Sequence, residues 1–131
     1  MSMPSPYLQY QQNAVLGAAP EQLTLMLYNG ALRFLKQALL AIDKKDAPGA
    51  HNAIVRVQAI IQYLRNTLKE GLDLSSSLDS LYDYLSRRLV EANLKKDPLI
   101  LQEVTELIEG LKDAWNQAAR QMKSGASLGY E

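Results

Sequence analysis

Residues 27–43 read LYNGALRFLKQALLAID, and their apolar side chains recur every three or four positions. At about 100° per residue, this spacing collects the apolar side chains in one wide arc of a helix. The arc contains Leu27, Tyr28, Ala31, Leu32, Phe34, Leu35, Ala38, Leu39 and Ile42. The opposite side carries Asn29, Arg33, Lys36 and Asp43. The stretch therefore predicts an amphipathic helix that buries one face.

Short polar breaks divide the rest of the chain, at residues 43–49, 70–73 and 93–98. Between the breaks lie long runs of helix-forming residues, at 20–44, 48–69, 76–95 and 98–122. Three of these runs begin with proline, which the first turn of a helix tolerates because its N–H is unpaired there. Asp97 suits the N-cap of the last run, and Ser76 with Asp79 resembles a capping arrangement for the third.

The three later runs show the same helical period, and none alternates with the two-residue period of a strand. Their predicted core positions are Ile54, Val57, Ile60, Ile61, Leu64, Leu68, Leu78, Leu81, Tyr82, Leu85, Leu89, Ala92, Ile100, Val104, Leu107, Ile108, Leu111, Trp115 and Met122. Short connections between long amphipathic helices predict an all-α fold, an antiparallel four-helix bundle. We expect an N-terminal cap segment or short helix at 1–19, the bundle at 20–123 and a flexible tail at 124–131.

Composition argues against several classes of protein. Cysteine is absent, which removes disulfides and thiolate metal sites. Lys plus Arg and Asp plus Glu number 14 each, so no overall charge attracts nucleic acid. The apolar runs are shorter than the roughly 20 residues that span a bilayer, and the N-terminus lacks the features of a signal peptide. A cytoplasmic protein without nucleic-acid partner or membrane insertion is expected.

The only histidine, His51, raises the alternative of a histidine phosphotransfer bundle. The residues that follow it, up to Arg56, lack the Lys and Gly that such domains place around the phosphorylated ring. A di-iron site needs Glu three residues before His, and that position is Pro48. We therefore expect an exposed surface histidine, and no catalysis, metal or cofactor.

Some apolar residues fall outside the predicted core arcs: Leu25, Met26, Leu40, Val55, Ala59, Tyr63, Tyr84 and Leu94. Most soluble proteins expose scattered apolar side chains, and this reading stays open. Val55, Ala59 and Tyr63, however, follow one another at i, i+4 and i+8, which places them in one row on a helix. Such rows favour a partner that packs on the outside of the bundle, either a client chain or another amphipathic helix bound by an adaptor.

Four sequence blocks, in the same order, resemble the flagellin export chaperones of the FliS family. They are YLQYQQN at 7–13, APEQLTLMLYNGA at 19–31, LYDYLSRRLVEAN at 81–93 followed by Lys96 and Asp97, and DAW at 113–115. The resemblance implies a cytoplasmic chaperone that binds the disordered C-terminal segment of flagellin and prevents its premature polymerisation. It further implies delivery to the cytoplasmic domain of the flagellar type III export gate. In parts of the family a flagellar regulator or anti-sigma factor is a further partner.

The flagellin-binding residues that we predict combine this resemblance with the apolar rows. They are Tyr10, Leu27, Tyr28, Ala31, Val55, Ala59, Tyr63, Tyr84, Leu85 and Asn93. Tyr28, Ala31 and Leu85 also lie in predicted core arcs, so their loss would act through stability. The N-terminal segment, which contains Tyr10, is expected to cover one apolar row until flagellin displaces it.

Overall fold

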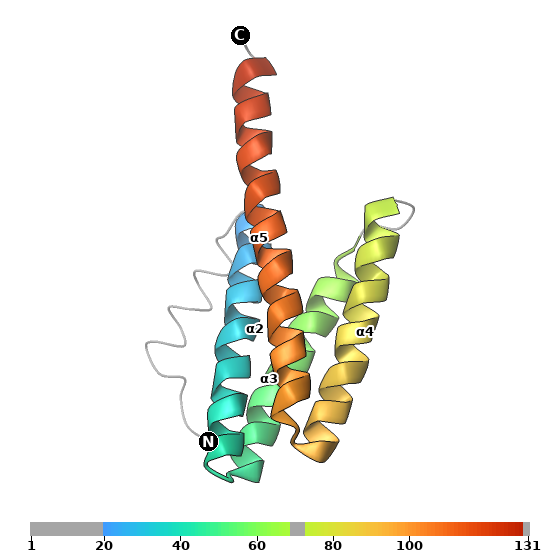
Figure 1. The fold of residues 1–131 in the computed structure, drawn as a ribbon. Coiled ribbons are helices and arrows are strands. Elements are labelled where there is room, and N and C mark those ends of the chain that lie inside the picture. The colour runs from blue at the N-terminus through green and yellow to red at the C-terminus, as the bar shows by residue number, and fades with distance from the viewer. Residues whose placement is uncertain (1–19, 69–72, 130–131) are drawn as a thin grey trace, which may run out of the picture.

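The structure, a computed structural model, describes the backbone of residues 20–68 and 73–129 and the side chains of 22–68 and 75–121. Within these ranges the chain forms no strand, and its helices are α2 (Pro20–Asp43), α3 (Ala47–Asn66), α4 (Asp73–Lys95) and α5 (Pro98–Gly129). Successive helices run antiparallel and pack in chain order, with α5 closing the bundle against α2 (Figure 1). The prediction of an all-α four-helix bundle is confirmed.

The turns from α2 to α3 and from α4 to α5 have the same construction. In the first, the Asp46 N–H donates a hydrogen bond to the carbonyl of Ala41 at 2.8 Å. In the second, the Asp97 N–H bonds in the same way to the carbonyl five residues earlier, at 3.2 Å. Lys45 and Lys96 have φ of 58° and 51°. This is the left-handed conformation that commonly ends an α-helix. Both hairpins are therefore closed by a lysine in a conformation that favours glycine.

Each turn also caps the helix that follows it. The Asp46 carboxylate accepts a hydrogen bond from the Gly49 N–H at 3.0 Å, and Pro48 lies in the first turn of α3. The Asp97 carboxylate accepts one from the Leu99 N–H at 2.9 Å, which confirms the predicted cap. These two polar breaks in the sequence thus each end one helix and cap the next.

The predicted start of the third helix is wrong. α4 begins at Asp73, so Ser76 lies inside the helix rather than at its cap. Asp79 does not complete a capping box, because its carboxylate pairs with Arg65 of α3 at 2.6 Å. Several neighbouring residues are of the capping type, among them Asp73 and Ser75, and periodicity does not decide between them.

Two predicted helix ends also differ from the structure. α3 ends at Asn66, where the Thr67 N–H closes the last turn on the Tyr63 carbonyl at 3.1 Å, earlier than the predicted Lys69. α5 continues to Gly129 rather than ending at Met122, because no proline interrupts it. The division into segments 1–19, 20–123 and 124–131 stays a prediction.

The core follows the predicted arcs closely. Its buried side chains are Tyr28, Ala31, Leu35, Ala38, Ala53, Ile54, Val57, Ile61, Leu64, Tyr82, Leu85, Leu89, Ala92, Ile100, Leu101, Val104 and Ile108. The other predicted core residues within the described side chains pack against this cluster. Ala53 and Leu101 were missed, and no charged side chain among the described residues is buried. None of the described helices combines the length and apolarity that crossing a membrane requires.

One hydrogen bond crosses this apolar interior. The hydroxyl groups of Tyr28 and Tyr82, which are 1% and 2% exposed, lie 2.7 Å apart and join α2 to α4. Burial raises the pKa of both phenols, and the bond to Tyr28 raises that of Tyr82 further. Each of these two hydroxyls supplies the hydrogen-bond partner of the other, because burying a polar group without a partner is unfavourable.

Candidate functional site

The outward side of α3 exposes an uncharged surface. It consists of Asn52, Val55, Ala59, Gln62, Tyr63 and Asn66, which we call the α3 outer face. Val55 and Tyr63 are 41% and 49% exposed, high values for large apolar side chains. The face spans about 21 Å at 1.5 Å per helical residue. The row predicted from the sequence is therefore present at the surface.

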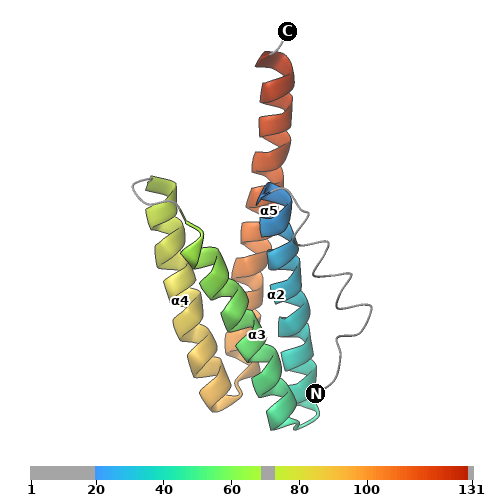
Figure 2. The same ribbon diagram turned by 180° about the vertical axis from the view of Figure 1, so that it is seen from behind.

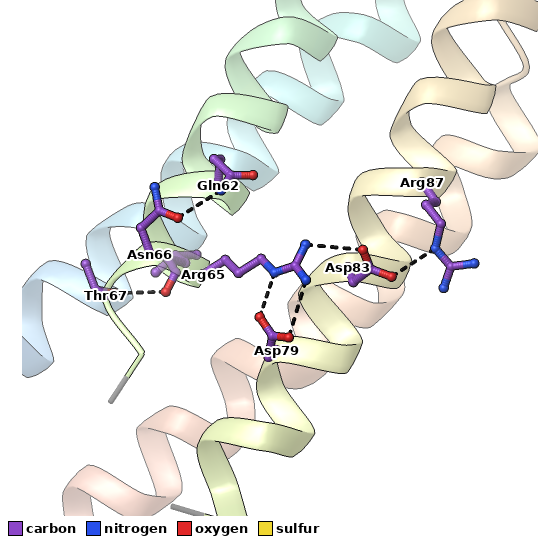
Figure 3. A network of polar contacts seen from close by, with 8 residues as sticks. Gln62, Arg65, Asn66, Thr67, Asp79, Asp83 and Arg87 are labelled. Carbon is purple, nitrogen blue, oxygen red and sulfur yellow. Dashed lines mark hydrogen bonds and ion pairs between the residues drawn. The ribbon is translucent and has the colours of Figure 1, made fainter. Parts of the chain in front are cut away.

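Amide groups border the apolar row. The Gln62 side chain donates a hydrogen bond to the Asn66 side chain at 2.9 Å, so these two amides partly satisfy one another (Figure 3). Charged groups are kept to the edges, where the Arg56 guanidinium lies over the Phe34 ring of α2 at 5.3 Å. A partner that covers the face therefore desolvates few charged groups. Desolvation of charge is the largest unfavourable contribution when polar surface is buried.

The exposed sides of two other helices differ from the α3 outer face. On α5, Glu106, Glu109 and Asp113 are exposed one turn after another. On α2, Arg33 and Lys36 are exposed in a similar row. A run of charged side chains is typical of a helix face that stays in water. The α3 outer face thus differs from these two exposed faces in its lack of charge.

The other predicted binding residues do not join this face. Tyr28, Ala31 and Leu85 are buried in the core, and Leu27 is half-buried against it. Tyr10 lies outside the described residues. The apolar arcs predicted this burial, so any effect of these core residues on binding is expected to act through the stability of the bundle.

Tyr84 and Asn93 lie at opposite edges of α4. The Tyr84 hydroxyl donates to a carboxylate oxygen of Glu103 on α5 at 2.7 Å. The Asn93 side-chain amide lies 2.9 Å from Nδ1 of His51, at the seam between α3 and α4. His51 is one turn before Val55, so Asn93 is near one end of the α3 outer face whereas Tyr84 is on the far side of α4.

His51 is exposed, as predicted. Its contact with Asn93 was not predicted, because it depends on which helices are neighbours. Among the described residues, no three His, Cys, Asp or Glu side chains are grouped so as to hold a metal ion.

A second set of exposed apolar residues lies near the turn from α4 to α5. Val90, Leu94 and Leu99 are 50%, 82% and 70% exposed. Leu94 was recognised from the sequence, but Val90, one turn before it, was missed. The i, i+4 spacing of the two was the available signal.

Ion pairs attach α4 to α3. The Arg65 guanidinium binds Asp79 through Nε at 2.6 Å and through Nη2 at 3.3 Å, and it reaches Asp83 at 3.2 Å (Figure 3). Arg87 binds the second oxygen of Asp83 at 3.1 Å. The hydrogen bond from Arg65 holds the pKa of the Asp79 carboxyl below its usual range.

A comparable group of polar contacts attaches α4 to α5. Glu103 accepts hydrogen bonds from Arg88 and Tyr84 of α4, each at 2.7 Å. These bonds, that from Arg88 first, lower the pKa of Glu103. Arg88 also pairs with Glu91 at 2.6 Å, and Lys95 pairs with Glu91 at 2.9 Å. Sequence reasoning missed all these pairs. The contacts of Glu103 depend on which helix edges meet, but the pairs of Glu91 lie within α4 at i, i+3 and i, i+4, and that spacing was an available signal.

The fold and the α3 outer face together define an all-α bundle with an exposed uncharged surface of the size of a short helix. A chain of this class is suited to bind another polypeptide.

Comparison with known proteins gives the family. The chain matches the family described as flagellar protein FliS over residues 3–122. It is 45% identical over 118 residues to the flagellar secretion chaperone FliS of Bacillus subtilis (strain 168), covering 90% of this chain and 89% of that one. It is 37% identical over 112 residues to the flagellar secretion chaperone FliS of Salmonella typhimurium, covering 81% of each. The chain belongs to the FliS family of flagellar secretion chaperones, which is not a class of enzymes.

Proposed function

We propose that this chain acts in the cytoplasm and binds the disordered C-terminal segment of flagellin there. By holding that segment it prevents premature polymerisation, and it then delivers the subunit to the flagellar type III export apparatus. The observation that carries the proposal is the α3 outer face, an uncharged exposed surface on a chain of a secretion chaperone family.

The binding physics fits such a client. A disordered segment loses conformational entropy when it binds, so it needs extended apolar contact in compensation. About 21 Å of surface accommodates roughly 14 residues of helix or 6 residues of extended chain. Ala59 is the small residue at the middle of the row, where it leaves room for another backbone to approach between Val55 and Tyr63.

A titration with the C-terminal segment of flagellin tests the proposal directly. We expect the full chain to bind it with a dissociation constant in the micromolar range or tighter. Val55→Glu places a charge on the α3 outer face and should weaken binding at least about tenfold, equivalent to about 1.4 kcal/mol. Leu99→Glu is the matched control, since it makes the same type of change at an exposed aliphatic residue on α5.

The outcomes separate the function from the surface. No binding by the unmodified chain would refute the proposed function. If both variants bind flagellin as tightly as the unmodified chain does, the proposed function stands but the α3 outer face is not the binding surface. Binding to unrelated amphipathic helices, but not to flagellin, would favour the helical adaptor.

The N-terminal segment is proposed to compete with the client. Deleting residues 1–18 should raise the affinity for flagellin or cause aggregation, because an apolar row then loses its cover. Unchanged binding and solubility would contradict this role.

A further inference from the structure

α4 makes a polar contact with each of the other three helices. Its Tyr82 hydroxyl meets Tyr28 of α2 in the core, and its Asp79 carboxylate meets Arg65 of α3 at the surface. Its Arg88 guanidinium meets Glu103 of α5 at 2.7 Å. Across the described part of the chain, every ion pair between two helices has one partner on α4.

The contact between α2 and α3 contains no ion pair among the described residues, although the Arg56 guanidinium of α3 lies over the Phe34 ring of α2, and its interior is apolar. A Cβ atom added to Gly30 of α2 would lie 3.5 Å from the Ile60 side chain of α3, an ordinary apolar contact at close helix approach. Ala31 of α2 and Ala53 of α3 are also buried small residues. Contacts of this type are not screened by salt and contain no group that titrates.

The seam between α4 and α5 narrows toward their turn. Both views show the two helices close together at the turn and apart at the other end, where α4 begins (Figures 1 and 2). Leu78 and Leu81, in the part of α4 distant from the turn, are only partly buried. Glu103 is in the second turn of α5, near the narrow end of the seam.

We propose that α4 is a hinged arm that swings about the turn at Lys96 and Asp97, and that Glu103 latches it to α5 through Tyr84 and Arg88. Opening separates α4 from α5 and also breaks the bonds of Tyr82 to Tyr28 and of Asp79 to Arg65, while α2 and α3 stay packed on each other. Leu85 of α4 and Ile108 of α5 are fully buried in the closed bundle, and the swing brings them to the surface. Use of this transient apolar surface by a client chain rests on the function proposed above, whereas the hinge itself does not.

Hydrogen exchange of the full chain at neutral pH, measured by mass spectrometry, tests the hinge without any client. Backbone amides exchange through local openings, so a helix that opens alone exchanges faster than the rest. Glu103→Gln keeps the size of the side chain and removes its charge. We expect it to accelerate exchange in α4 by about two- to fivefold, the range for one exposed ion pair. Exchange in α2 and α3 should stay unchanged.

Glu106→Gln is the matched control, because Glu106 is exposed on the same helix and makes none of these contacts. It should leave exchange in all helices as it is. Equal acceleration of all four helices by Glu103→Gln would mean global unfolding and would overturn the hinge. Unchanged exchange in α4 would overturn the latch, and with it the proposal. Flagellin binding is measured separately, so failure here leaves the proposed function standing.

Discussion

The two hairpins of the bundle, α2 with α3 and α4 with α5, have turns of the same construction but differ in the contacts between their helices. α2 and α3 meet through small and apolar side chains, with Gly30 and Ile60 at close approach, and through the Arg56 guanidinium over the Phe34 ring. α4 and α5 meet through apolar core residues and also through the contacts of Arg88 and Tyr84 with Glu103. Burial of apolar surface supplies most of the free energy of folding, whereas exposed ion pairs contribute little and respond to salt and pH. The first hairpin is thus expected to be the stable half, and the second the adjustable one.

Leu35→Ala should have the largest effect, because it breaks the stable half. Leu35 is fully buried on α2, and its truncation leaves a cavity that the packed bundle fills only in part. We expect the free energy of unfolding to fall by about 2 to 5 kcal/mol, measured by urea denaturation. Leu40→Ala is the control, since Leu40 is 50% exposed on the same helix and should change stability far less.

The tyrosine pair that joins the halves should come next. Tyr82→Phe leaves the buried Tyr28 hydroxyl without a partner and should lower the unfolding free energy by about 1 to 3 kcal/mol. The double change with Tyr28→Phe removes both hydroxyls and should restore part of this loss. Additive losses in the double variant would contradict the pairing.

The same pair predicts a dependence on high pH. The pKa values of both phenols are raised in the folded chain, so the neutral pair is fully stabilising below the unfolded value of about 10. The stabilisation is lost as the pH rises above that value, because the unfolded chain releases protons that the folded chain retains. Melting temperatures between pH 9 and about 11 should fall less steeply for the double Phe variant than for the unmodified chain.

Glycine substitutions at the left-handed lysines compare the contributions of the two turns to stability. Lys45→Gly relieves a left-handed lysine and should stabilise the chain by about 0.5 to 1 kcal/mol. Lys96→Gly should give a smaller gain, because the Lys96 ammonium also binds the Asn93 side chain at 2.7 Å and that bond is lost. Equal gains, measured by thermal denaturation, would show that this bond contributes nothing.

Titration by acid of the carboxylates that pair with α4 or lie on it should show the smallest effect. The pKa values of Asp79, Glu91 and Glu103 are lowered in the folded chain. Their ionised forms therefore stabilise it above the unfolded values of about 4, and this is lost as the pH falls through the lowered values. Glu103→Gln should reduce the slope of melting temperature against pH in this range. A slope identical to that of the unmodified chain would contradict the pairing with Arg88.

Most of the fold was predictable from the sequence, because the helical period of residues such as Leu35, Ile61 and Leu89 assigns each helix a buried side. Pro48 located the start of α3 to within one residue, and Asp97 with Pro98 located that of α5. The start of α4 was not predictable, since Asp73 and the serines after it all suit a cap.

The candidate site was predictable in part for the same reason. The row of Val55, Ala59 and Tyr63 depends only on spacing within one helix. The contacts of Arg65, Glu103 and His51 depend on which helix edges meet, and periodicity within single helices carries no information about that. Tyr84 was predicted as a binding residue, but its hydroxyl is bonded to Glu103, a contact that only the packed bundle defines.

The long last helix has a practical consequence for experiments. α5 continues well past the level at which α2 begins (Figure 1), and among the described side chains the last one that packs on the core cluster is Trp115. From there to Gly129 the helix rises about 21 Å. A fluorescent protein joined to the C-terminal end would start from this projection, away from the side of α3. Such a fusion should report on the protein in living cells without covering the α3 outer face.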